Sequence, residues 1–184
     1  MLLRASMRLA LALVLGGSLL AADLPGVWLD VPFVAQSREG CGSASLAMVM
    51  QYWLVREHQS IGEAAQEPVI YHALYSREAG GIFASDLESY LREHGFRVFA
   101  FRGAWDDLRH HLEKGRPLLV ALRPSEGAPL HYVVVAGMDW NRGLVMVNDP
   151  AGRKLMKRER HSFEQQWESA GNWTLLALPQ AETP

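Results

Sequence analysis

The segment from His131 to Asp139, "HYVVVAGMD", most constrains how this chain can fold. A strand with one face in water would alternate apolar and polar residues, but here apolar residues occupy both faces. We therefore expect this strand at the centre of a sheet that is covered on both sides. The turn "WNRG" and the run "LVMVNDP" then predict that the chain returns as an adjacent antiparallel strand.

The remaining segments predict helices mainly in the first half of the chain and strands mainly in the second. The first helix, in whose first turn Cys41 lies, is apolar or small all round, which is typical of a buried helix. Ser85 and Glu88 have the spacing of a capping box for a later helix. This arrangement predicts an α+β fold with segregated layers. Further helices are expected near 67–76, 85–95, 104–115 and 162–171, and strands near 27–35, 96–101, 116–124, 144–150 and 173–179.

Length and charge restrict the classes of protein to consider. The chain has 184 residues, which suggests one domain with a full core. Its net charge of -2 gives no indication of nucleic-acid binding. The short basic run at residues 157–160 contains an acid and is expected on a solvated strand or turn.

The first 22 residues have the pattern of a secretory signal peptide. Arg4 and Arg8 are their only charged side chains, and the apolar run from Leu9 to Ala22 is too short for a membrane-spanning helix, which needs about 20 apolar residues. We expect residues 1–22 to be removed and residues 23–184 to form the exported domain, periplasmic or secreted. An uncleaved membrane anchor is the alternative, and after signal removal no stable membrane insertion is expected.

Cys41 is the only cysteine, so it cannot form a disulfide within the chain. Its thiol is either buried and inert or used in chemistry, and the start of a helix stabilises a thiolate. Among seven histidines, His131 is the best base, because it opens the central strand after a flexible loop. The hairpin centred near Asn141 brings His131 within a residue or two of Asp149, where cross-strand Cβ atoms are about 5 Å apart. Asp139 lies at the other end of the strand, about 26 Å away.

Gln36 lies five residues before Cys41 and could donate its side-chain amide to an oxyanion, beside the backbone N–H of Cys41. The four residues then supply a nucleophile, a base, a group that orients the base and an oxyanion donor. The neighbouring His110 and His111 do not face one another on a helix, and no further ligands stand at metal spacing. The sequence therefore predicts no metal and no cofactor.

The segments "VPFVAQSREGCGSASLAMVMQYW" and "HYVVVAGMDWNRGLVMVNDP" together resemble the C39 family of cysteine peptidases and its C39-like relatives, which are compact members of the papain-like group. The resemblance runs from about Val27 to Leu178. It implies a papain-like fold whose nucleophile helix packs on an antiparallel sheet. It also implies a triad of Cys41, His131 and Asp149, with Gln36 in the oxyanion hole, acting on a peptide or protein substrate.

Two other classes of function remain open at this point. Hydrolases of cell-wall peptides or amides, of the NlpC/P60 or amidase type, also use a cysteine on a helix and a histidine on a strand, but their third group is usually another polar residue. A peptide-binding module that has lost catalysis is the other alternative, and the intact set of four groups argues against it. Nothing in the sequence indicates the oligomeric state.

Overall fold

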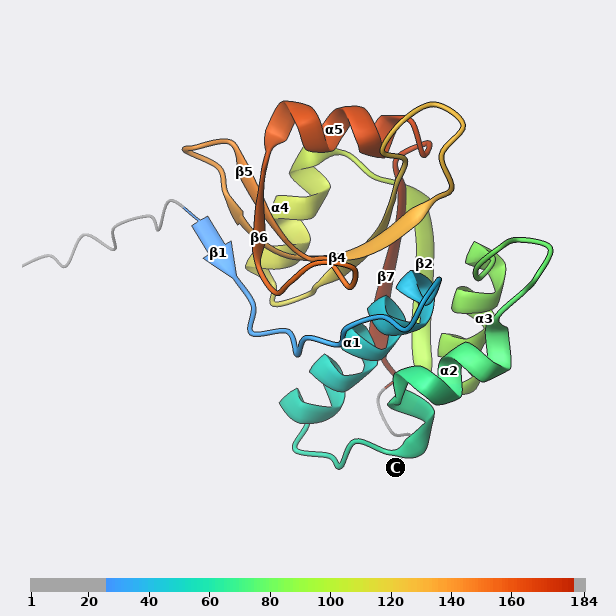
Figure 1. The fold of residues 1–184 in the computed structure, drawn as a ribbon. Coiled ribbons are helices and arrows are strands. Elements are labelled where there is room, and N and C mark those ends of the chain that lie inside the picture. Colours follow the sequence, from blue (N-terminus) through green and yellow to red (C-terminus); the bar gives the residue numbers. More distant parts are fainter. Residues whose placement is uncertain (1–25, 181–184) are drawn as a thin grey trace, which may run out of the picture.

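The computed structural model describes residues 26–180, which form a seven-stranded antiparallel sheet between two layers of helices (Figure 1). The strands are ordered β2-β7-β3-β4-β5-β6, and β1 pairs with the end of β4 that lies beyond β3. The segment that is apolar on both faces is the central strand β4, as expected. The strands are β1 Gly26–Trp28, β2 Phe96–Arg102, β3 Leu118–Leu122, β4 His131–Asp139, β5 Leu144–Asn148, β6 Met156–Glu159 and β7 Trp173–Pro179.

The helices divide between the two faces of the sheet. On one face α1, α2 and α3 form a helical layer with the short 3-10 helix η1, and on the other face α4 and α5 cover the sheet (Figure 1). Each layer has its own buried apolar cluster. The predicted α+β class is therefore confirmed. The helices are α1 Cys41–Arg56, η1 Glu63–Ala65, α2 Glu67–Leu74, α3 Ala84–Glu93, α4 Trp105–Glu113 and α5 Arg160–Glu168.

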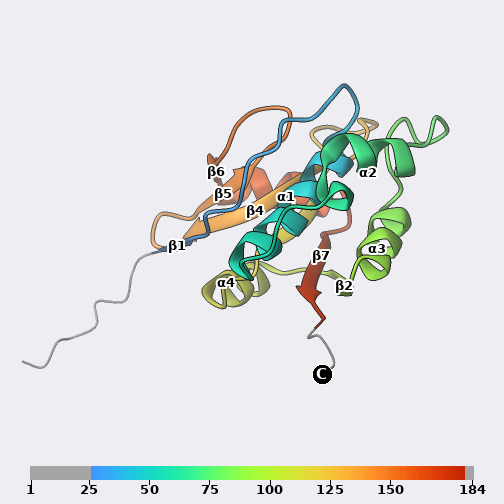
Figure 2. The same cartoon turned by 90° about the horizontal axis from the view of Figure 1, so that it is seen from below.

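Helix α1 connects the helical layer to the sheet. It lies along β4 (Figure 2), and every residue from Gly42 to Trp53 is buried. The buried hydroxyl of Ser45 donates to the backbone oxygen of Tyr132 in β4, at 3.0 Å. This bond fixes the start of α1 beside the start of β4. The two segments that carry Cys41 and His131 are thereby held together.

The β4–β5 hairpin contains one irregularity. Its register is Asp139↔Leu144 near the turn and Val134↔Asn148 further along, with a shift between Val135 and Gly137. The shift means that β4 has one extra residue between Val135 and Gly137. This β-bulge changes the local twist and the direction of the side chains. Because this register places Asn148 opposite Val134, the next residues of the chain reach the region of His131.

The expected capping box at the start of α3 is wrong. The helix begins at Ala84 with Phe83 as its N-cap and without a side-chain cap, so Ser85 lies inside the first turn. Ile82 and Leu87, which flank this first turn, are both buried in the same apolar cluster. Their burial sets the start of the helix by a hydrophobic staple, which outweighs a hydroxyl cap. Glu88 instead pairs with Arg92 at 2.7 Å.

The predicted signal peptide at residues 1–22 lies outside the described residues. Among residues 26–180, none of the helices combines the length and the apolar composition that crossing a membrane requires.

Candidate active site

The loop that leads into α1 is anchored by a buried carboxylate. Glu67, the first residue of α2, is only 7% exposed, and its Oε1 accepts hydrogen bonds from Ser37 and from Ser43, each at 2.9 Å. Gly40 is buried between them, and a Cβ at this position would lie 2.7 Å from Glu67 Oε1. The loop therefore needs glycine immediately before Cys41. These contacts fix the position of Cys41 at the first turn of the helix.

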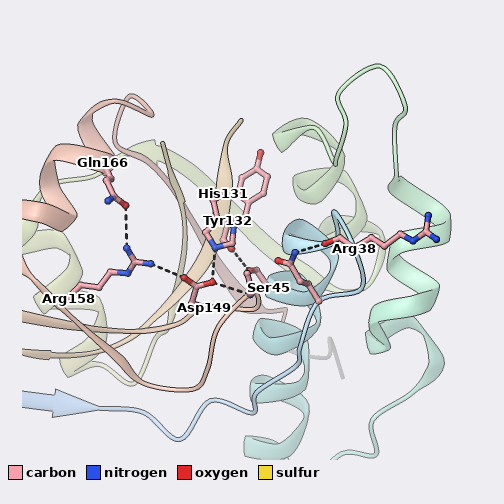
Figure 3. A network of polar contacts seen from close by, with 9 residues as sticks. Arg38, Ser45, His131, Tyr132, Asp149, Arg158 and Gln166 are labelled. Carbon is pink, nitrogen blue, oxygen red and sulfur yellow. Dashed lines mark hydrogen bonds and ion pairs between the residues drawn. The ribbon is translucent and has the colours of Figure 1, made fainter. Parts of the chain in front are cut away.

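His131 and Asp149 lie together, as the hairpin geometry predicts (Figure 3). His131 Nε2 and Asp149 Oδ1 are 2.7 Å apart. An interaction of the histidine ring with the side chain of Cys41 also raises the pKa of His131. Since Nε2 faces Asp149, the other ring nitrogen, Nδ1, is the one that can serve Cys41. The thiol, the imidazole and the carboxylate thus lie in series, an arrangement in which a proton can pass between the sulfur atom and the ring.

Two other polar residues of the β4–β5 hairpin, Asp139 and Asn148, make different contacts and do not orient His131. Asp139 accepts the backbone N–H of Arg142 at the turn of the hairpin. The side chain of Asn148 is held by backbone groups elsewhere, because its amide donates to Val31 O at 3.2 Å and its oxygen accepts Leu155 N at 2.9 Å. Both residues therefore hold backbone in place and leave Asp149 as the partner of the histidine.

Asp149 has a second charged partner that the sequence did not indicate. Arg158 of β6 donates from Nη2 to Asp149 Oδ2 at 2.8 Å, while its Nη1 is 3.3 Å from Gln166 Oε1 (Figure 3). The backbone N–H of Ala151 also donates to Oδ1, at 3.1 Å. The expectation that the basic run lies on a solvated strand or turn is thus wrong for Arg158. The strand assignment holds, but alternation along β6 turns Arg158 inward.

The electrostatics of His131 and Asp149 favour an ion pair between the two side chains. Burial by itself lowers the pKa of His131, but hydrogen bonds with Asp149 and Cys41 outweigh it and raise the pKa to about 9. Burial opposes ionisation of Asp149, yet hydrogen bonds from His131, Ala151 and Arg158 hold the pKa of its carboxyl below the ordinary value. At neutral pH the ring is therefore protonated and the carboxylate is charged.

Gln36 lies in the same loop as Cys41, but its amide has a local partner here. Gln36 Nε2 donates to the backbone oxygen of Arg38, and Oε1 is buried with no hydrogen-bond partner among residues 26–180. The backbone N–H of Gln36 donates to Pro150 O at 3.0 Å, which ties this loop to the residue after Asp149. To serve an oxyanion, the amide would exchange the Arg38 carbonyl for the substrate oxygen.

Two adjoining cavities open at Cys41. The larger one, about 400 Å³, is apolar and is bounded mainly by the segment from Gly80 to Ala84, by Leu130 and by Tyr132. Burial and the nearby charge of Cys41 raise the pKa of Tyr132 to about 12, so its hydroxyl stays neutral. The smaller cavity, about 280 Å³, is bounded by Glu39, Pro124 and His131. Both share Cys41, so a chain bound across the nucleophile could occupy either side.

Comparison with known proteins places the chain in a family. A family model described as the Peptidase_C39 like family matches residues 28–175. The chain belongs to this family. The expected membership is thereby confirmed, and so is the expected class of enzyme, a cysteine-type peptidase. No curated protein matches the chain. Within residues 26–180 no group of three or more His, Cys, Asp or Glu could hold a metal ion.

Solved structures of C39 peptidases share the fold. A protein from Bacillus anthracis described as a C39-like peptidase is 18% identical over 85% of this chain and 99% of its own, with a TM-score of 0.67. The peptidase domain of Streptococcus ComA, a bifunctional ABC transporter of a quorum-sensing pathway, is 18% identical over 82% and 99%, with a TM-score of 0.63. A double glycine motif protease from an AMS/PCAT transporter, in complex with its leader peptide, is 23% identical over 84% and 95%, with a TM-score of 0.61. The expected papain-like fold is confirmed.

Proposed function

We propose that this C39-like peptidase hydrolyses peptide bonds with Cys41 as nucleophile, His131 as the proton carrier, Asp149 as its orienting partner and Gln36 as an oxyanion donor. The observation that carries the proposal is the contact series at the start of α1. Cys41 lies close enough to the ring of His131 to raise the pKa of the ring, and the same ring is 2.7 Å from a buried carboxylate oxygen. This arrangement supplies both the charge and the direction that a thiol nucleophile needs.

In the proposed mechanism His131 takes the thiol proton of Cys41, the thiolate sulfur attacks the scissile carbonyl carbon, and the carbonyl oxygen becomes an oxyanion. The backbone N–H of Cys41 and the amide of Gln36 would stabilise this charge. Protonated His131 then donates its proton to the leaving amine, which leaves a thioester on Cys41. Neutral His131 next takes a proton from water, the water oxygen attacks the thioester carbon, and the acid product leaves as the thiol is restored.

The two cavities at Cys41 support a polypeptide substrate. An extended chain across the nucleophile could place one side chain in the apolar cavity beside Ile82 and Tyr132, and the residue on the other side of the scissile bond near Glu39. The double glycine motif protease described above binds a leader peptide. We infer for the present chain only the shared chemical class, a peptide that can enter the cleft in extended form.

The decisive experiment is peptide-library profiling of the purified protein in the presence of a reductant. Cys41→Ala should abolish cleavage of the best peptide and leave the fold intact, because little volume is lost at the start of a helix. Asp149→Ala should weaken cleavage less, because Cys41 and His131 remain but the ring loses its orientation. Cleavage by the Cys41→Ala protein would contradict the proposal. Hydrolysis of purified peptidoglycan in place of polypeptides would instead assign the site to cell-wall peptides.

We also propose that the protein acts outside the cytoplasm. The support is the pattern of residues 1–22, with two arginines before an apolar run that ends in alanine. N-terminal sequencing of protein from the extracytoplasmic fraction should find a mature chain that begins near Ala22 or Asp23. Recovery of the full-length chain in membranes would support an anchor instead.

A further inference from the structure

We propose that Arg158 is a positioning residue of the active site, which fixes the Asp149 carboxylate in the orientation and charge state that aim His131 at Cys41. This inference rests on the proposed function and deepens it. The arginine lies on β6, outside the segments that carry the other four residues of the site. Its Nη2 is 2.8 Å from Asp149 Oδ2, so the carboxylate uses one oxygen for His131 and the other for Arg158.

The contacts on both sides of the arginine show that it is held in place. Its side chain is 23% exposed, and that of Asp149 is 8% exposed. Nη1 reaches Gln166 of α5, while Nε is buried without a hydrogen-bond partner among residues 26–180. A guanidinium is a planar donor, so contacts at two nitrogens restrict its plane. Helix α5 thereby fixes Arg158, and Arg158 fixes the carboxylate.

A carboxylate with one fixed oxygen can still rotate about its Cβ–Cγ bond, whereas one with both oxygens fixed cannot. Asp149 Oδ1 receives His131 Nε2 and the backbone N–H of Ala151, and Oδ2 receives Arg158. Charge-assisted hydrogen bonds of this kind are stronger and shorter than neutral ones. The direction of Oδ1 toward the ring is therefore set by the guanidinium at Oδ2. A displacement of about 1 Å at a catalytic group can cost about 10²-fold in rate.

The charges around Asp149 give this arrangement a second effect. The charged and titratable groups in this series are His131 from β4, Arg158 from β6 and, beyond the ring, Cys41 from α1, and α5 contributes the neutral amide of Gln166. Arg158 is thus the permanent cation of the set, since guanidinium groups stay protonated in proteins. It keeps Asp149 ionised as the pH falls, and an ionised Asp149 is needed to hold protonated His131.

The test compares Arg158→Met, Arg158→Lys and Gln166→Leu with Arg142→Met. Arg142 is a suitable control because its side chain is 75% exposed at the turn beyond the far end of β4. We expect kcat/KM to fall by about 10-fold to 10²-fold in Arg158→Met, and by less in Arg158→Lys, which keeps the charge but loses the planar fork. Gln166→Leu should give the smallest loss, and Arg142→Met should match the wild type. Circular dichroism would verify that each variant is folded.

The pH dependence separates positioning from a merely structural role. Without the guanidinium, protonated Asp149 becomes relatively more favourable, so its carboxyl ¹³C resonance should titrate at higher pH in Arg158→Met than in the wild type. The acidic limb of kcat/KM should move to higher pH by a similar amount. A loss of activity by one constant factor at every pH, with an unchanged Asp149 titration, would overturn the proposal. So would wild-type kcat/KM in Arg158→Met.

Two further outcomes are also decisive. If Arg158→Met does not fold, the Asp149 ¹³C titration and the pH dependence of kcat/KM are measured in Arg158→Lys instead. Wild-type results for both in that folded variant would overturn the proposal that the planar guanidinium is needed. If the wild-type protein cleaves no peptide, the proposed function fails separately. The ¹³C titration of Asp149 still shows in that case whether Arg158 controls the carboxylate.

Discussion

The raised pKa of His131 makes a quantitative prediction about stability. The pKa rises from the ordinary 6.5 to about 9, although burial opposes this, because the ring hydrogen-bonds Asp149 and Cys41. A difference of this size corresponds to about 3 kcal/mol of interaction that favours the protonated ring in the folded protein. A group with a raised folded pKa contributes its full stability below the unfolded pKa and loses it as the pH rises through the folded pKa. This stability should therefore be lost between pH 6.5 and about pH 9.

The assay is urea unfolding of the wild type and of His131→Gln across this range, with a reductant present. The difference between their free energies of unfolding should shrink by about 3 kcal/mol from about pH 6 to about pH 10. His111→Gln is a control of opposite sign, because burial, followed by the charge of His110, lowers the pKa of His111. The free energy of unfolding of the wild type minus that of His111→Gln should therefore grow with pH. A difference for His131→Gln that does not change with pH, or an imidazole NMR titration near 6.5, would refute the reasoning.

Two further predictions concern the loop before α1. Glu67→Ala removes the shared acceptor of Ser37 and Ser43, so we expect the free energy of unfolding in urea to fall by about 1–3 kcal/mol, together with a lower kcat. Unchanged stability and kcat would show that the loop holds its shape without the carboxylate. Gln36→Ala should lower kcat by about 10²-fold if the amide stabilises the oxyanion, with little change in urea unfolding, since within residues 26–180 its side chain bonds only the Arg38 carbonyl. Full kcat in this variant would remove Gln36 from the mechanism.

The sequence predicted well where one short segment determines the geometry. A hairpin has a single register once its turn is known, and this was enough to pair His131 with Asp149 and to exclude Asp139. The bulge between Val135 and Gly137 did not affect this prediction, because it shifts the register by only one residue. The buried character of α1 and β4 followed equally directly from their apolar composition.

Contacts between distant segments were not predicted. Glu67 reaches the loop before Cys41 from the start of another helix, and nothing local marks it as buried. Arg158 lies in a run that reads as solvated, since the sequence does not show that α5 covers that end of the sheet. Gln36 was found by its spacing from Cys41, but spacing does not determine which carbonyl its amide meets. The start of α3 was misjudged because burial of Ile82 and Leu87 outweighs the local capping preference.

The hydrogen bond from Ser45 to the Tyr132 carbonyl joins segments that are 87 residues apart. Cys41 and His131, the proposed nucleophile and base, therefore belong to separate parts of the chain, and folding brings them together. A nascent or unfolded chain carries an ordinary thiol and an ordinary imidazole. In such a design latency requires no inhibitory segment. Under the proposed mechanism, reactivity arises only when α1 and β4 lie side by side, so the active site cannot cleave its own chain before then.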